Sequence, residues 1–266
     1  MSDQKIIVQF TVLTFGIAYL VSGALIALGP FGYSVYNWVH SLRQFGMNIP
    51  FAIYILSPAI ASYLVLKKNN KIADWKEWSK TVFYAKNSIF LYLFVVAGLA
   101  LYFLIHLAVS GHTELMLPFY TLFLSLPGNL VIGGLEEAGW MYILQPKLDK
   151  KIGFIGSSLL VGLIWILWHI PLFFIPGTNH GEGLINFWMF AVQLLAFRFF
   201  NGAIYKISGK GCVFMCVFFH TLFNAASPLF GTMTMTWTGT LVANAAIVLV
   251  SILTVKLWEA RRRPVY

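Results

Sequence analysis

The stretch FIGSSLLVGLIWILWHIPLFFI, residues 154–175, decides what kind of protein this chain is. It contains no lysine, arginine, aspartate or glutamate, and an α-helix needs about 20 apolar residues to cross the hydrocarbon core of a bilayer. In the whole chain 59% of residues are hydrophobic and only 10% are charged, whereas soluble domains have about 25% charged residues. The sequence therefore predicts a membrane protein, and its long apolar runs favour helices, which bond their own backbone.

Similar apolar runs lie on both sides of this stretch, and together they predict an all-α polytopic protein with about eight transmembrane helices. The run at 116–142 is the longest and contains Pro127 and a Gly-Gly pair, so we expect a kink or a break in it. The first run is too long for the apolar region of a signal peptide, and we interpret it as the first span. The predicted spans cover residues 6–28, 51–66, 89–109, 116–142, 154–175, 184–205, 213–230 and 239–257.

Basic residues distinguish the two sides of the predicted bundle. They cluster in alternate loops and at the C-terminal end, whereas the opposite loops carry only Arg43. Because positive residues favour the cytoplasmic side, we expect both termini to be cytoplasmic. The net charge of +9 is then a topology signal that involves the lipid bilayer and no nucleic acid. The basic positions are Lys67, Lys68, Lys71, Lys76, Lys80, Lys86, Lys147, Lys150, Lys151, Lys206, Lys210, Lys256, Arg261, Arg262 and Arg263.

Three smaller features complete the predicted organisation. Residues 71–86 place aromatic side chains at helical spacing between lysines, which is typical of a helix lying in the membrane interface. A plain basic loop is the alternative for this segment. Cys212 and Cys216 are too few for a disulfide framework, and we interpret them as small packing residues. We find no repeat or linker, so residues 1–266 are expected to form a single transmembrane domain.

Two adjacent acids, Glu136 and Glu137, lie inside the fourth predicted span. A carboxylate at bilayer depth is costly, so such a residue is a functional candidate with an expected partner. Two neighbouring carboxylates cannot both be charged cheaply in a medium of low dielectric constant. We therefore expect a cation beside them or a proton on one of them.

Two histidines and an amide occur at bilayer depth in other spans. His169 lies two residues before Pro171 in the fifth span, and His220 and Asn224 share one face of the seventh. Counted along the helices, Glu136 and His220 lie about 15 Å inside the basic side, with His169 somewhat deeper. The similar depth favours one site over three separate packing residues, although a merely structural polar cluster is the alternative.

These residue types are suited to hydrolysis by an activated water. A carboxylate with a histidine can deprotonate water, and a histidine with an asparagine can donate hydrogen bonds to an oxyanion. The chain lacks the HExxH and G-x-S-x-G patterns of common zinc proteases and serine hydrolases. No metal cofactor is favoured. If zinc is used, its ligands would be Glu136, His169 and His220, because three ligands and a water make a catalytic zinc site.

At these positions the chain resembles the CPBP family of intramembrane proteases, also called the Abi family. This family includes the type II CAAX prenyl endopeptidases and proteins linked to bacteriocin processing or self-immunity. Its pattern is EExxxR, then an aromatic residue with xxxH, then HxxxN or HxxxD. The counterparts here lie within about residues 130–228 and are Glu136-Glu137, Trp165 with His169, and His220 with Asn224.

The resemblance implies an intramembrane endopeptidase of the cell membrane. Its substrate would be a peptide or protein at the membrane, prenylated or bacteriocin-like. Glu136 would act as general base with His169, while His220 and Asn224 would stabilise the oxyanion. Glu137 and Trp165 would support these four residues.

One position departs from the family pattern, because Met141 stands where the pattern has arginine. An arginine there would neutralise Glu137 along one helix face, and methionine cannot. Arg198 is the only arginine at bilayer depth in the sequence, so we hypothesise that it pairs with the two acids; snorkelling to the interface is the alternative. The departure also leaves open an inactive protein for bacteriocin self-immunity or partner binding. A proton-coupled transporter is a third interpretation, which no inverted repeat supports.

Overall fold

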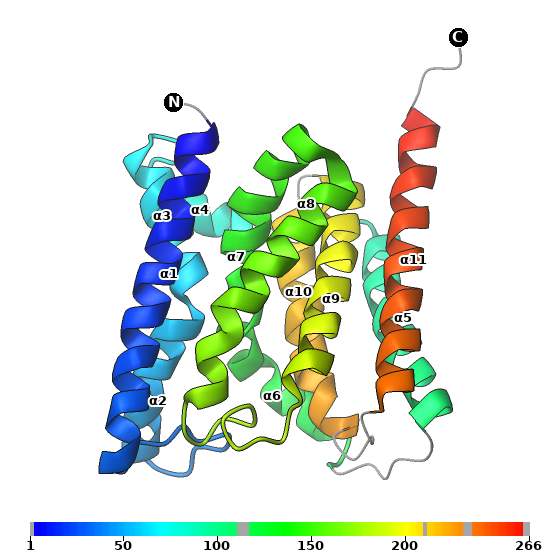
Figure 1. The fold of residues 1–266 in the computed structure, drawn as a ribbon. Helices are drawn as coiled ribbons and strands as arrows, with labels where there is room; N and C mark the ends of the chain where they lie inside the picture. Colours follow the sequence, from blue (N-terminus) through cyan, green and yellow to red (C-terminus); the bar gives the residue numbers. More distant parts are fainter. Residues whose placement is uncertain (1–2, 111–116, 210–211, 231–235, 263–266) are drawn as a thin grey trace.

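In a computed structural model the chain forms a helical bundle (Figure 1), and the structure describes residues 3–110, 117–209, 212–230 and 236–262. These ranges contain no β-strand, which confirms the predicted all-α fold. Between the longer helices lie 3-10 turns and, over Trp140–Leu144, a π-helix. The α-helices are α1 (Asp3–Leu28), α2 (Leu42–Ile55), α3 (Ser57–Lys68), α4 (Trp75–Val82), α5 (Ile89–Ser110), α6 (Tyr120–Val131), α7 (Glu137–Gly139), α8 (Gln145–His169), α9 (Phe187–Ser208), α10 (Cys212–Ala226) and α11 (Trp237–Arg262).

Within the described ranges, six helical segments are long and apolar enough to cross a membrane, and the bent pair of α2 and α3 makes a seventh. One of the six, Tyr120–Phe174, has 55 residues and would extend about 80 Å as a continuous helix. The chain reverses direction inside this segment near Gly153, within α8 (Figure 1). The segment therefore contains both the fourth and the fifth predicted spans, and about eight crossings agree with the structure.

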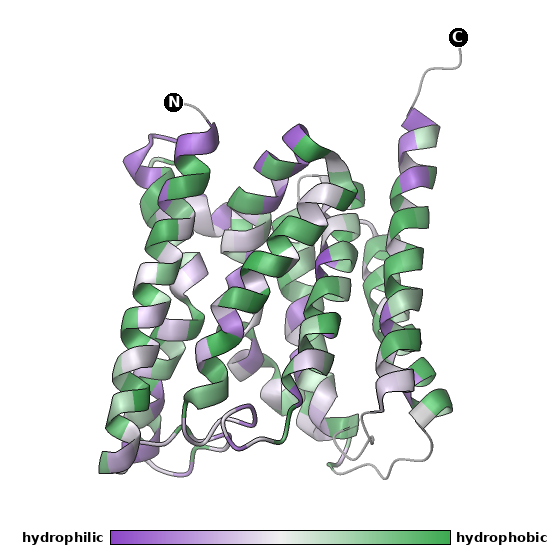
Figure 2. Ribbon diagram, viewed as in Figure 1, coloured by the Kyte–Doolittle hydropathy of each residue, from purple (hydrophilic) through white to green (hydrophobic). Residues whose placement is uncertain are grey.

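The two ends of the bundle differ in positive charge. The start of α1 and the end of α11 lie at the same end (Figure 1), as an even number of crossings requires. Hydrophilic residues gather at that end in Figure 2, where Lys206 pairs with Asp149 at 3.1 Å and with Glu259 at 2.9 Å. Lys210 and Arg263 lie outside the described residues. The cytoplasmic location of this end stays a prediction from its positive charge.

The second span is longer than predicted and is bent. Instead of residues 51–66 it comprises α2 and α3, which meet at an angle of 54°. The bend lies at Leu56, because Pro58 in the first turn of α3 lacks the N–H that would continue α2. The predicted interfacial helix at 71–86 is also shorter, because α4 begins after its N-cap Asp74 and ends before Phe83.

Gly153 permits the reversal that separates the fourth span from the fifth. Its backbone has φ 70° and ψ 176°, a region that essentially only glycine occupies. Nothing lies within 4 Å of a Cβ at this position, so Gly153→Ala acts on the backbone alone. We expect it to lower the free energy of unfolding by about 1–3 kcal/mol, measured by thermal unfolding in detergent. Gly16→Ala, in the interior of α1 with equally open space, is the control and should not destabilise, because alanine suits a helix interior better than glycine.

Candidate functional site

The predicted fourth span is broken where its two glutamates lie. Helix α6 ends at Val131, Gly133 has φ +132°, and Glu136 and Glu137 follow in a 3-10 turn and the short helix α7. The π-helix Trp140–Leu144 comes next, and insertions of this kind are frequent at functional sites. Glu136 is only 2% exposed and Glu137 is fully buried. The break therefore places both carboxylates inside the bundle.

Glu137 is the charge-paired member of the two. The Nη1 atom of Arg198 donates to its Oε2 at 2.7 Å, and Nη2 of the same guanidinium donates to Oε1. On the other side, Nδ1 of His220 lies 2.9 Å from Oε1. Arg198 is fully buried, so the interfacial alternative for this residue is wrong; of the two acids with which it was expected to pair, it binds Glu137. The pair is bidentate, the stronger arrangement for arginine and carboxylate, and it joins α7, α9 and α10.

Glu136 has a different environment. Its Oε2 accepts hydrogen bonds from Nε1 of Trp165 at 2.8 Å and from Nε1 of Trp140 at 3.4 Å. Both donors are neutral. In the described part of the chain no lysine, arginine or histidine forms an ion pair with Glu136. The two adjacent glutamates thus differ in their partners, because among the described residues Glu137 has a cation beside it and Glu136 does not.

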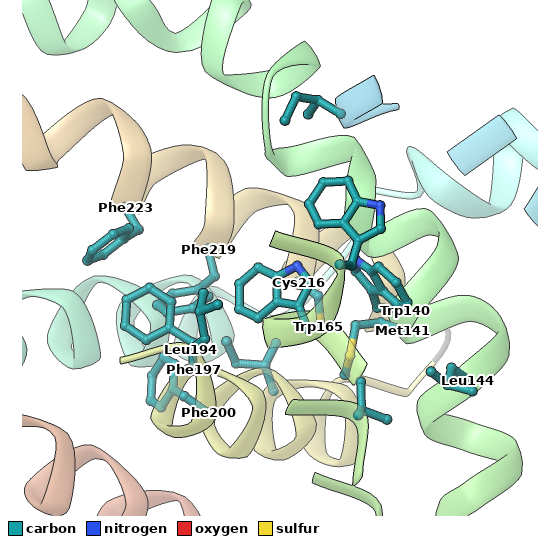
Figure 3. Close-up of a cluster of buried hydrophobic side chains, with 14 of the residues drawn as sticks. Trp140, Met141, Leu144, Trp165, Leu194, Phe197, Phe200, Cys216, Phe219 and Phe223 are labelled. Atoms are coloured by element: carbon teal, nitrogen blue, oxygen red, sulfur yellow. The ribbon is translucent and has the colours of Figure 1, made fainter. Parts of the chain in front are cut away.

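Trp165 connects the two glutamates to both histidines. Its indole N–H binds Glu136, and its ring face lies 3.8 Å from Cζ of Arg198, a cation–π contact. The ring centroid is 4.9 Å from that of His169 and 5.5 Å from that of His220. In Figure 3 Trp165 lies within the buried apolar cluster that also contains Trp140 and Met141. This packing fixes the orientation of the indole, so its contacts set the relative positions of the polar groups.

His169 is held in a defined tautomer. Its Nδ1 lies 2.9 Å from the carbonyl oxygen of Trp165, and because a carbonyl only accepts, Nδ1 carries the hydrogen. A neutral His169 then keeps its lone pair on Nε2, where it can accept a proton. Among the described residues His169 forms no hydrogen bond with Glu136. The two residues share Trp165 instead.

His220 and Asn224 lie beside the break in the fourth span. Nδ2 of Asn224 donates to the carbonyl oxygen of Ile132 at 3.3 Å. A Cβ built on Gly133 would lie 2.2 Å from Nδ2 of Asn224 and 3.3 Å from Nε2 of His220. The amide of Asn224 can therefore lie this close to the backbone only because position 133 has no side chain. The fold thus brings the predicted residues into one contiguous group. Within it Glu137 contacts His220, and Glu136 contacts Trp165.

Gly133 is a residue of the candidate site that sequence reasoning did not identify, although the Gly-Gly pair before the acids was a signal. At φ +132° a side chain is strained, and alanine would also collide with the amide of Asn224. We expect Gly133→Ala to lower peptide-cleaving activity by about 100-fold or more, the effect of losing an oxyanion donor. The neighbouring Gly128→Ala, where a Cβ meets nothing within 4 Å, should change the same rate little.

Metal ligation receives no support from the side-chain arrangement. Across the described ranges no group of three His, Cys, Asp or Glu residues is placed to hold a metal ion, and this includes the conditional set Glu136, His169 and His220. Cys212 and Cys216 are both free thiols. Cys216 is fully buried and its Sγ donates to the carbonyl of Asn201 at 3.4 Å, consistent with a packing role.

Comparison with known proteins agrees with the motifs. Residues 118–226 match the sequence model of the family described as Rce1-like, type II CAAX prenyl endopeptidase. No curated protein matches the chain. The matched residues begin just before α6 and end with α10, so they include the broken span, both glutamates, both histidines, Asn224 and Arg198. The chain is thus a multi-pass membrane protein whose residues 118–226 are similar to the Rce1-like type II CAAX prenyl endopeptidase family.

Proposed function

We propose that the chain is an intramembrane endopeptidase that hydrolyses a peptide bond with water activated by Glu136 and His169. The observation that carries the proposal is the contrast between the two glutamates. Glu137 is neutralised by Arg198 and contacts His220, whereas the hydrogen bonds that Glu136 accepts from described residues come from neutral N–H groups. A carboxylate that is not held by a cation can accept a proton from a water molecule, as a general base must.

The reaction would proceed by direct attack of water. Glu136, with Nε2 of His169, removes a proton from the water as its oxygen bonds to the peptide carbonyl carbon. The carbonyl oxygen becomes an oxyanion, which accepts hydrogen bonds from Nε2 of a protonated His220 and from Nδ2 of Asn224. The C–N bond then breaks, and the proton held by Glu136 passes to the leaving amine.

These roles require a hydrogen on both ring nitrogens of His220, and charge balance is compatible with that. With His220 protonated, the group holds two carboxylates, one guanidinium and one imidazolium, so its formal charge is zero before substrate binds. Glu137 accepts from Nδ1 of His220 at 2.9 Å, which leaves Nε2 as the donor beside Gly133. A buried site without net charge avoids most of the cost of placing ions in low dielectric.

The proposed substrate is a peptide or protein at the membrane, with a prenylated C-terminal CAAX segment as the first candidate and a bacteriocin-like peptide as the second. The cell membrane is the proposed location. The test is cleavage by the purified chain in detergent of a farnesylated CAAX peptide, the same peptide without its lipid, and an unrelated membrane peptide. Release of the last three residues from the lipidated peptide alone identifies a CAAX endopeptidase, and cleavage of all three a broader protease.

The same assay separates the alternatives. Parallel reactions with a chelator test a metal, and we expect the rate to be unchanged. A folded protein that cleaves none of the peptides would contradict the proposal. It would favour a binding or self-immunity function. In that case cells that carry the Glu136→Gln variant should keep the wild-type phenotype. Transport of protons by the chain in vesicles would favour the transporter.

A further inference from the structure

We infer that Arg198 on α9 takes the part that the family pattern gives to an arginine at position 141, and that it positions Glu137 and His220 for catalysis. The inference rests on the proposed function. It explains how a chain without the pattern's arginine keeps the same charge at the same carboxylate. Arg198 is thereby a positioning residue, which acts on the reaction through Glu137 and His220.

The side chains at positions 141 and 198 meet at one place. The sulfur of Met141 lies 3.8 Å from Nη1 of Arg198, the same nitrogen that donates to Glu137 at 2.7 Å. Both side chains are fully buried. Met141 follows Glu137 by one helical turn, so a longer, charged side chain at position 141 would reach the same carboxylate. An arginine at either position could therefore place its guanidinium beside Glu137.

Only one of the two positions can carry the charge. Glu137 has two oxygens, which already accept from both terminal nitrogens of Arg198 and from His220. A second guanidinium would find no free oxygen on Glu137 and would lie beside the like charge of Arg198 in a buried site, which is unfavourable. Methionine, apolar and flexible, instead fills the space beside the ion pair. Met141 together with Arg198 thus gives Glu137 one guanidinium. Arginine at both positions would give it two, and arginine at neither position would give it none.

Placing the arginine on α9 leaves one of its hydrogen-bond donors without a partner among the described residues. Arg198 uses both terminal nitrogens on Glu137, and its buried Nε finds no partner among the described residues. Its guanidinium is held against the face of Trp165, 3.8 Å from the ring centroid. Since Trp165 also donates to Glu136, Arg198 affects both glutamates, one by direct pairing and one through the indole.

The test exchanges the two residues. Purified wild type, Met141→Arg, Arg198→Met and the double variant Met141→Arg/Arg198→Met are compared for thermal unfolding in detergent and for cleavage kinetics. We expect both single variants to unfold at lower temperature and to lose at least about 100-fold in kcat, because Glu137 and His220 lose their fixed positions. The double variant should recover stability and kcat to within about tenfold of wild type. KM should change little in all of them.

The two readouts keep this inference separate from the proposed function. If wild type cleaves no peptide, the endopeptidase proposal fails, but recovery of stability in the double variant alone still supports the exchange. If wild type cleaves and the double variant is neither more stable nor more active than the single variants, the exchange is wrong. Arg198→Lys keeps the charge without the bidentate fork, and wild-type kcat in this variant would likewise overturn the positioning role.

Discussion

Glu136→Gln is expected to abolish peptide cleavage while leaving the fold intact. The amide has the size of the carboxylate, and its oxygen can still accept from Nε1 of Trp165 and Trp140, but it cannot take a proton from water. Removing a general base costs about 10²–10⁴-fold in rate. The measurement is kcat on a cleaved peptide, together with thermal unfolding to show that the protein is folded.

Glu182→Gln is a matched control for this variant. Glu182 lies in the loop before α9 and accepts from the backbone N–H of Gly177 at 2.8 Å, a bond that glutamine can keep. It should retain wild-type kcat. Cleavage by Glu136→Gln at more than about one tenth of the wild-type rate would remove Glu136 from the role of general base.

Glu137→Gln is expected to act mainly on stability. It leaves the guanidinium of Arg198 buried and without a countercharge, and its amide N–H₂ faces a donor of Arg198 or His220. Breaking a buried ion pair by removing one partner costs about 3–5 kcal/mol. We therefore expect a large fall in unfolding temperature and in the yield of folded protein, measured by fluorescence-detected size exclusion after heating.

The neighbouring glutamate provides the control. Glu136→Gln removes no ion pair and should unfold close to the wild-type temperature, so adjacent substitutions of the same kind should differ sharply in their effect on stability. The double variant Glu137→Met/Arg198→Met removes both buried charges and should recover stability without recovering cleavage. Equal stability of the two single Gln variants would contradict the assigned ion pair.

The fold class and most of the site could be predicted from the sequence. Apolar runs of spanning length give the number of helices, and the charges of the loops give their alternation. The glutamates, histidines and asparagine stand out because polar residues are rare in such helices. Each of these signals depends on local composition alone.

The relative rotation of the helices could not be predicted in the same way. In a membrane protein the lipid-facing and core-facing sides of a helix are both apolar, so the sequence pattern does not show which side is buried. In α5, for example, Val95 is fully buried and Val96 is 50% exposed. The bend at Leu56 and the role of Gly133 depend on such tertiary placement. The pairing of Arg198 with Glu137, and not with Glu136, also depends on it.

The identity of the attacking group tests the central claim most directly. A peptide that the chain cleaves is incubated with wild type in ¹⁸O-labelled water containing hydroxylamine, and the fragment with the new C-terminus is weighed by mass spectrometry. Direct attack by water held by Glu136 and His169 predicts a carboxylate with one heavy oxygen atom and no hydroxamate. A hydroxamate product would show that an acyl-enzyme forms first, and would contradict the account of Glu136 as the base that activates water.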